Sequence, residues 1–89
     1  MTQILKNEPD ELSQDDLIVQ TILGNIPRLV RDQDLFAEDL MGRDAWKTFS
    51  KGMRIVIGGV IYRLVESKLL PLTYVGKTSS NKNIYRLAY

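Results

Sequence analysis

The chain contains neither cysteine nor histidine. Without cysteine it can form no disulfide bond and no thiolate metal site. Without histidine it lacks the usual general base, the commonest zinc ligand and the histidine of a serine-based catalytic triad. Carboxylates, lysine, tyrosine and serine remain for chemistry, and no convincing pair of carboxylates is visible. We therefore expect a protein that is not an enzyme and that uses no metal ion or cofactor.

Long apolar stretches are also missing. No run of about 18 or more apolar residues is present, so no membrane span is expected. Residues 1–10 are too polar for a signal peptide, and we expect a cytoplasmic protein. A length of 89 residues suits one domain with one modest core.

Each half of the chain is poor in charge of one sign. Residues 1–50 carry ten acidic and five basic side chains, a net charge of −5. Residues 51–89 carry seven basic side chains and one acidic side chain, Glu66, a net charge of +6. The positive half would attract polyanions, of which nucleic acid is the commonest. The alternative, which implies no charged partner, is that the opposite charges form ion pairs with each other within the fold.

The first helix has a clear predicted start. Residues 1–11 show no regular period and contain Pro9, which predicts a flexible arm before a domain over residues 12–89. Ser13 is a good N-cap, and Asp16 three residues later completes a capping-box pattern. The cluster Asp10, Glu11, Asp15 and Asp16 is better explained by this helix start than by a metal site.

This first helix should end at Gly24 and Asn25, because Pro27 prevents its continuation. Its expected apolar face comprises Leu17, Ile18, Thr21 and Ile22. After it, residues 35–37 predict a short strand. A second helix is expected from about Leu40 or Arg43 to Phe49, with Leu40, Trp46 and Phe49 facing the core.

A third helix is predicted from Lys51 to Lys68, capped by Ser50. Its expected buried face comprises Met53, Val56, Ile57, Val60, Ile61 and Leu64. The adjacent Gly58 and Gly59 cost about 1 kcal/mol each relative to alanine in a helix. Such a cost needs a reason, and we expect close helix packing at one glycine, with a partner's approach left open at the other.

The chain ends in a predicted hairpin. Residues 72–77 and 83–89 alternate between apolar and polar side chains, and a polar turn over residues 78–82 separates them. Gly76 indicates a β-bulge. The fold class expected from this order is a small α+β domain of three helices followed by a two-stranded hairpin.

That order of elements resembles a winged helix, in which the third helix and the hairpin, or wing, contact DNA. A finer pattern over residues 35–87 comprises Leu40-Met41-Gly42, Trp46, Arg54, Gly58, Leu64-Val65-Glu66, Gly76-Lys77-Thr78-Ser79-Ser80-Asn81 and Tyr85. It is similar to a family of small, uncharacterised bacterial and phage domains. The resemblance implies a winged-helix fold and no particular activity. The acidic first half departs from typical DNA-binding domains of this fold.

The leading hypothesis is therefore a small nucleic-acid-binding protein, such as a bacterial or phage regulator, that prefers duplex DNA to RNA. Its expected contact residues lie on the third helix and around the hairpin turn: Lys51, Arg54, Tyr62, Arg63, Lys77, Ser79, Ser80, Asn81, Lys82 and Arg86. Each of these side chains has an ordinary explanation as a solvated or ion-paired surface group, so the hypothesis depends on their clustering.

Two other hypotheses use the charge asymmetry differently. In one, the chain is a protein-interaction module, for example an adaptor or a phage-encoded inhibitor, whose charged ends dock on a partner protein. In the other, the acidic end of one copy binds the basic end of the next, and the chain forms a homodimer or a larger head-to-tail assembly.

Overall fold

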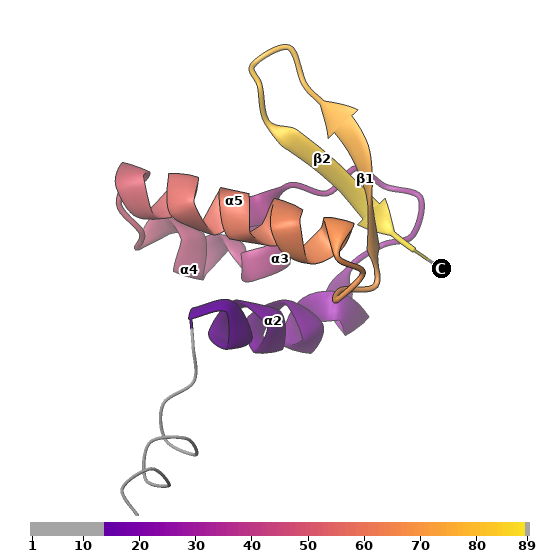
Figure 1. The fold of residues 1–89 in the computed structure, drawn as a ribbon, viewed down its shortest axis with the longest axis horizontal. Helices are drawn as coiled ribbons and strands as arrows, with labels where there is room; N and C mark the ends of the chain where they lie inside the picture. Colours follow the sequence, from indigo (N-terminus) through magenta and orange to yellow (C-terminus); the bar gives the residue numbers. More distant parts are fainter. Residues whose placement is uncertain (1–13, 89) are drawn as a thin grey trace, which may run out of the picture.

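The computed structural model of the protein describes residues 14–88. Its elements, in order, are α2 (Gln14–Asn25), a short 3-10 helix η1 (Ile26–Arg28), α3 (Ala37–Met41), α4 (Arg43–Lys47), α5 (Lys51–Glu66), β1 (Leu72–Lys77) and β2 (Asn83–Leu87). The helices pack together, and the antiparallel hairpin rises beside α5 (Figure 1). The expected α+β class, with helices followed by a C-terminal hairpin, is confirmed.

Helix α2 carries Asp15 and Asp16 in its first turn, where carboxylates favour the positive end of the helix dipole. The predicted cap Ser13 and the arm over residues 1–11 lie outside the described residues. The helix ends at Asn25 as expected, and Pro27 then lies in η1.

The predicted apolar face of α2 is partly wrong. Ile18 and Ile22 are buried, whereas Leu17 and Thr21 are exposed. Burial of all four predicted residues would need neighbouring elements on both sides of α2. Helix α2 instead packs on α3 and α5 along the narrower line that Ile18 and Ile22 define.

The prediction of one helix over residues 40–49 is also wrong. Two helices of five residues, α3 and α4, meet at Gly42. Gly42 has a φ angle of +97°, which no helix accommodates and which glycine adopts most easily. Leu40 is fully buried, while Trp46 and Phe49 are only partly buried and pack edge to face with ring centroids 5.9 Å apart.

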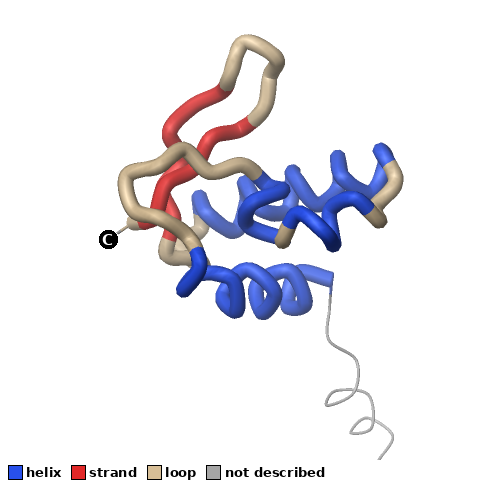
Figure 2. The backbone as a smooth tube through the Cα atoms, turned by 180° about the vertical axis from the view of Figure 1, so that it is seen from behind, coloured by secondary structure: helices blue, strands red, loops and turns tan. Residues whose placement is uncertain are grey.

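The predicted strand over residues 35–37 is reduced to a single residue. Leu35 exchanges two backbone hydrogen bonds of 2.8 Å with Tyr85, and Ala37 already begins α3. The N–H group of Phe36 donates to the Asp39 carboxylate at 2.9 Å, which turns the chain into the helix. Figure 2, seen from behind, shows the long loop between α2 and α3 crossing in front of the hairpin, where this bridge forms.

Helix α5 begins where predicted, because the Met53 N–H group donates to the Ser50 hydroxyl at 3.1 Å. It ends at Glu66, two residues before the expected end, and Lys68 has a φ angle of +64°. Its buried residues are Ile57, Val60, Ile61, Leu64 and Val65.

The predicted burial of Met53 and Val56 is wrong, since these side chains are 40% and 48% exposed. The first turns of α5 project beyond the start of α2 (Figures 1 and 2), so they receive less cover than the middle of the helix. The apolar face therefore shifts toward the C-terminal half of α5, where the unpredicted Val65 joins it.

The hairpin carries the predicted bulge. Tyr74 pairs with Tyr85 and Gly76 pairs with Ile84, so Val75 is the extra residue. Gly76 has a φ angle of +152°, a conformation that side chains other than glycine rarely adopt. The predicted polar turn is also confirmed: the Thr78 N–H group donates to the Lys82 carbonyl at 2.9 Å.

One apolar core holds these elements together. It comprises Ile18, Ile22, Leu35, Leu40, Met41, Ile57, Val60, Ile61, Leu64, Val65, Leu70, Leu72 and Tyr85. Members come from α2, α3, α5, both strands, the α2–α3 loop and the α5–β1 loop. The hairpin is thus part of the core and not an appendage to it.

We predict opposite results for two isoleucines on α5. Ile61→Ala should lower the free energy of unfolding by about 2–5 kcal/mol, because Ile61 is fully buried and truncation leaves a cavity. Ile55→Ala should change it by less than about 0.5 kcal/mol, because Ile55 is 68% exposed. Urea denaturation of both variants measures the difference, and equal losses would contradict the core described above.

Candidate functional site

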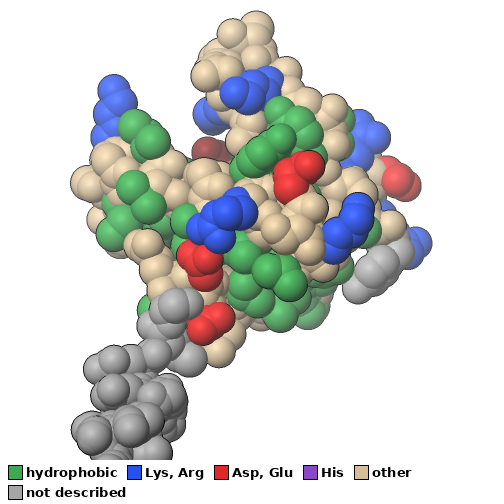
Figure 3. Space-filling model, in the orientation of Figure 1, with side chains coloured by type: hydrophobic (Ala, Val, Ile, Leu, Met, Phe, Trp, Pro, Cys, Tyr) green, Lys and Arg blue, Asp and Glu red, His purple; other side chains and the backbone are tan. Residues whose placement is uncertain are grey.

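A groove of about 360 Å³ lies between the N-terminal half of α5 and the hairpin. Figure 3 shows the hollow that separates these two parts of the surface. Its α5 side is lined by Lys51, Arg54, Ile55, Gly58 and Gly59, its hairpin side by Asn81, Lys82, Asn83 and Tyr85, and the rest by Phe36, Ala37, Glu38 and Trp46. The groove therefore combines apolar and aromatic side chains with several cations.

The two adjacent glycines lie on the α5 side of this groove. Apart from its own stretch of helix, a methyl group built on either Gly58 or Gly59 would meet no atom of residues 14–88 within 4 Å. The expectation that one of them serves close helix packing is therefore wrong. Ile55, three and four residues earlier on the same side of the helix, is the most exposed large apolar side chain described. This stretch of α5 presents bare backbone and apolar surface to solvent.

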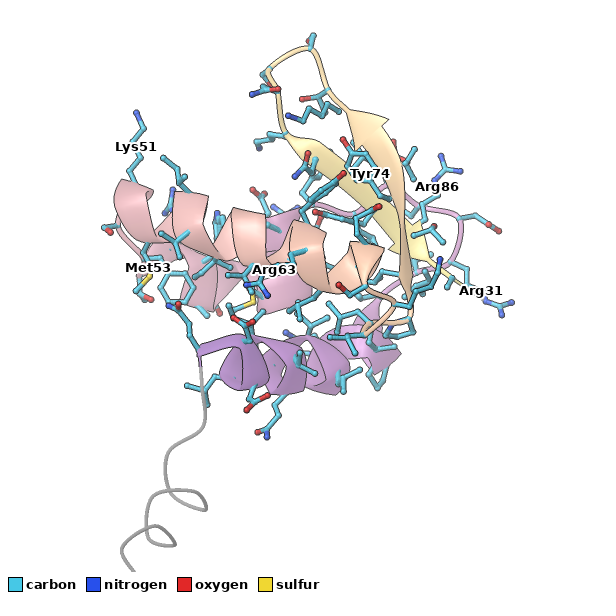
Figure 4. The ribbon with its side chains drawn as sticks, in the orientation of Figure 1. Arg31, Lys51, Met53, Arg63, Tyr74 and Arg86 are labelled. Carbon is cyan, nitrogen blue, oxygen red and sulfur yellow. The ribbon has the colours of Figure 1, made fainter. Side chains whose placement is uncertain are left out.

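Arg54 is held at the groove by Trp46. Its Nε donates to the Trp46 backbone carbonyl at 3.2 Å, and its guanidinium carbon lies 5.8 Å from the centre of the indole ring. Arginine and tryptophan in this arrangement attract each other through a cation–π interaction. Lys51, at the start of α5, forms no ion pair with a described residue and points away from the helix end in Figure 4.

Lys82 reaches the groove from the hairpin turn. Its Nζ lies 3.6 Å from a Glu38 carboxylate oxygen and 5.4 Å from the centre of the Phe36 ring. Glu38 also contacts Arg43 at 3.4 Å. Because more than half of the Lys82 side chain is exposed, this ion pair contributes at most about 1 kcal/mol and can exchange for another partner.

Two arginines of the predicted basic surface do not join the groove. Arg63 donates two hydrogen bonds to Asp15, of 2.8 and 3.3 Å, and Arg86 donates two to Asp34, of 3.0 and 2.9 Å. The Arg63 hydrogen bond lowers the pKa of the Asp15 carboxyl, and the same contact raises the pKa of Arg63. Figure 4 shows Lys51, Arg63 and Arg86 on well-separated parts of the surface.

The predicted contact residues are therefore divided. The groove is lined by four of them: Lys51, Arg54, Asn81 and Lys82. The other six do not line it: Tyr62, Arg63, Lys77, Ser79, Ser80 and Arg86. Tyr62 packs edge to face on Tyr74, with ring centroids 5.0 Å apart. Lys77, Ser79 and Ser80 lie at the hairpin turn and the end of β1.

Sequence reasoning missed the apolar part of the groove. Trp46 and Ile55 line it, although Trp46 was expected to fill the core and Ile55 was given no role. The paired glycines were the available signal, because their helix cost has no explanation inside the described chain. Phe36, Glu38 and Asn83 gave no signal, since the chain brings them together only through its tertiary fold.

Tyr85 is a buried member of the groove lining with an unusual hydroxyl group. The residue is 1% exposed, and its Oη has no hydrogen-bond partner among the described residues. Burial raises the pKa of Tyr85 to about 12, and the nearby Asn83 side chain offsets part of that rise. The Asn83 Oδ1 atom accepts a hydrogen bond of 3.4 Å from the Tyr74 hydroxyl instead.

We predict that Tyr85→Phe leaves the protein at least as stable at neutral pH, because it removes a buried donor that has no acceptor. The raised pKa means that the folded state keeps the Tyr85 proton between pH 10 and about 12 while the unfolded state loses it. Stability should thus fall with rising pH across this window, and less steeply in Tyr85→Phe. Urea melts at several alkaline pH values test this, with Tyr74→Phe as control.

We also predict that Gly58→Ala and Gly59→Ala each raise the free energy of unfolding, by about 0.5–1 kcal/mol, because alanine favours the helix and meets no neighbour. Gly76→Ala is the matched contrast. It should destabilise by about 1 kcal/mol or more, because the φ angle of +152° at Gly76 strains any side chain. A destabilised Gly59→Ala variant would show that this surface is not open in the folded chain.

Two classes of site find no support in residues 14–88. No group of three or more acidic side chains in this range could hold a metal ion. No helix in the same range has the length and apolarity that a bilayer crossing requires.

Comparison with known proteins places the chain in a family without assigning an activity. No curated protein and no solved structure matches it. A family model described as a domain of unknown function, DUF1413, matches residues 20–86. This match runs from the middle of α2 to the residue before the end of β2, and it includes every residue of the groove lining. The chain therefore belongs to the DUF1413 family.

Proposed function

We propose that this chain is a protein-interaction module on a winged-helix-like scaffold, and that the groove between α5 and the hairpin takes a segment of a partner protein. In a winged helix, the third helix and the wing form one recognition surface. We assign α5 and the hairpin to these two roles, and the groove lies between them.

The observation that carries the proposal is the open Gly58-Gly59 surface beside exposed Ile55. Glycines allow another backbone or a bulky side chain to approach α5 closely. Ile55 and Trp46 supply apolar area that a protein partner would remove from water, and aromatic residues are enriched in such interfaces. This apolar side of the groove offers few favourable contacts to the phosphate groups of a nucleic acid.

The charge around the groove indicates what the partner segment carries. Lys51, Arg54 and Lys82 place three positive charges around it, and Glu38 is its one acidic lining residue. A segment with an apolar side chain for the Ile55 side and carboxylates for these cations is electrostatically complementary. An amphipathic acidic helix meets both requirements, because it can place apolar and acidic groups on adjoining faces.

Nucleic-acid binding is the second candidate. It is favoured by the position of Lys82 and Asn81, which bring the hairpin turn to the same groove as Lys51. Lys77, Ser79 and Ser80 in and beside that turn would add phosphate contacts. It ranks second because Arg63 and Arg86 are already paired with carboxylates of the acidic half. Fewer available cations mean fewer phosphate contacts and weaker binding.

A photoreactive side chain at position 55 tests the first proposal. Ile55→benzoylphenylalanine should form a covalent adduct with one protein in the cells that make this chain. Val30→benzoylphenylalanine is the control, because Val30 is also exposed but does not line this groove. With the captured protein purified, Gly59→Leu should weaken binding at least tenfold while the variant stays folded. An equal adduct at position 30, or unchanged affinity in Gly59→Leu, would contradict the proposal.

The fluorescence of Trp46 distinguishes nucleic-acid binding, the second candidate function, from protein binding. Trp46 is the only tryptophan and lines the groove, so its fluorescence reports binding there. Duplex DNA should leave the emission unchanged at both low and moderate salt if the groove binds only protein. A change at low salt that disappears in the Lys51→Ala, Lys82→Ala double variant but persists in Arg28→Ala, Arg31→Ala would favour nucleic acid.

A further inference from the structure

The outer edge of β1 carries backbone groups that the chain leaves unpaired. Tyr85 exchanges its backbone hydrogen bonds with Leu35, so its N–H and C=O groups point away from β1. Tyr74 lies directly opposite Tyr85 in the hairpin. In an antiparallel ladder such a pair shares no hydrogen bonds, and the N–H and C=O groups of Tyr74 therefore point outward from the sheet.

The backbone N–H and C=O groups of Leu72 also point outward from the sheet. The Ala88 N–H group donates to the Pro71 carbonyl at 2.9 Å, so Pro71 points toward β2 and Leu72 points away. No described residue donates to or accepts from the backbone of Leu72 or Tyr74 on this outer side. Two N–H groups and two C=O groups thus form a short, regular edge without a partner among the described residues; Tyr74 is half-buried there and Leu72 is 5% exposed.

The bulge at Val75 sets the length of this edge. The extra residue shifts the alternation of inward-pointing and outward-pointing backbone groups after Tyr74. The N–H and C=O groups of Gly76 therefore point inward, toward Ile84, and do not extend the outward-pointing edge. A bulge of this kind normally protects an edge strand from indiscriminate pairing. Only a partner strand that matches the outward groups at Leu72 and Tyr74 can add here.

We propose that this edge pairs with β1 of a second copy of the chain, antiparallel, about a two-fold axis at Thr73. In this register Leu72 of each copy lies opposite Tyr74 of the other. All four outward groups of each edge then form hydrogen bonds, and the two hairpins become one four-stranded sheet. The two Thr73 side chains, both exposed in the single chain, meet across the axis in a favourable pair.

Charge supports a second copy as the occupant. Lys77 ends β1, and Glu66 lines a small groove beside Leu72, Thr73 and Tyr74 at its beginning. Neither Lys77 nor Glu66 forms an ion pair with a described residue. Antiparallel pairing brings Lys77 of each copy to the end of β1 where Glu66 of the other copy lies, beside Lys68, which lines the same small groove. The symmetric contact therefore contains the same complementary pair twice.

This pairing is independent of the groove between α5 and the hairpin, because none of Glu66, Leu72, Thr73, Tyr74 and Lys77 lines that groove. It also differs from head-to-tail association. A two-fold contact uses the same surface on both copies and stops at a dimer, whereas a head-to-tail contact continues to larger assemblies.

Sedimentation and amide hydrogen exchange of the full chain over a range of concentrations test the proposal. The mass should rise from monomer to dimer and stop there. The amides of Leu72 and Tyr74 should exchange fast in the monomer and slow at least tenfold in the dimer, while the inward-pointing amide of Thr73 is protected in both. A chain that stays monomeric at millimolar concentration, or a dimer in which these two amides still exchange fast, would overturn the proposal.

Charge reversal supplies the second measurement. Glu66→Lys and Lys77→Glu should each weaken dimerisation, by roughly tenfold, because each places like charges together at two symmetric positions. The double variant Glu66→Lys, Lys77→Glu should restore it, since the pair is re-formed with its signs exchanged. Lys82→Glu is the matched control and should leave dimerisation unchanged. Loss of dimer in Lys82→Glu without loss in Glu66→Lys would assign association to the groove and refute the pairing of β1 edges.

Discussion

The two hydrogen bonds between Leu35 and Tyr85 join the hairpin to the rest of the molecule. They connect the α2–α3 loop to β2, and the buried Tyr85 ring fills the space between the strands and α5. One wall of the groove is hairpin, another is α5, and Phe36 and Glu38 follow directly after the bridge. The groove exists because this contact fixes the angle between hairpin and helix. Without it the hairpin would be held only by the core packing of residues such as Leu72 and Tyr85.

The acidic first half neutralises part of the basic second half. Asp15, Asp34 and Glu38 each pair with a cation from beyond residue 50, and each pair joins segments distant in sequence. All three pairs are largely exposed and contribute little stability individually. Their larger effect is on the outer field, because charges that meet within the chain no longer attract a distant polyanion. This reverses the order of the two leading functional hypotheses.

Local signals predicted much of the fold. Ser50 capped α5, Pro27 followed the end of α2, and Gly76 marked the bulge, because each acts through its own backbone. Burial was harder, since it depends on where neighbouring elements stop: Met53 has a helical spacing typical of a core, yet it is 40% exposed and meets α2 only at its first residue, where the Gln14 Nε2 atom lies 4.0 Å from the Met53 sulfur. The site was predicted least well. Arg54 and Lys82 were expected, but nothing in the sequence linked Trp46, Glu38 and Asn83 to them.

The adjacent Gly58 and Gly59 lower the local stability of α5. They weaken the middle of the helix that supplies more core residues than any other element, and residues 14–88 provide no compensating contact there. Transient local opening should therefore concentrate at this point. A ligand that binds over Gly58 and Gly59 would suppress this local opening. The more stable helix would then also reduce the motion of Ile57, Val60 and Ile61, which it buries in the core. Binding at the proposed groove would thus be coupled to the rigidity of α5 through the absent side chains of Gly58 and Gly59.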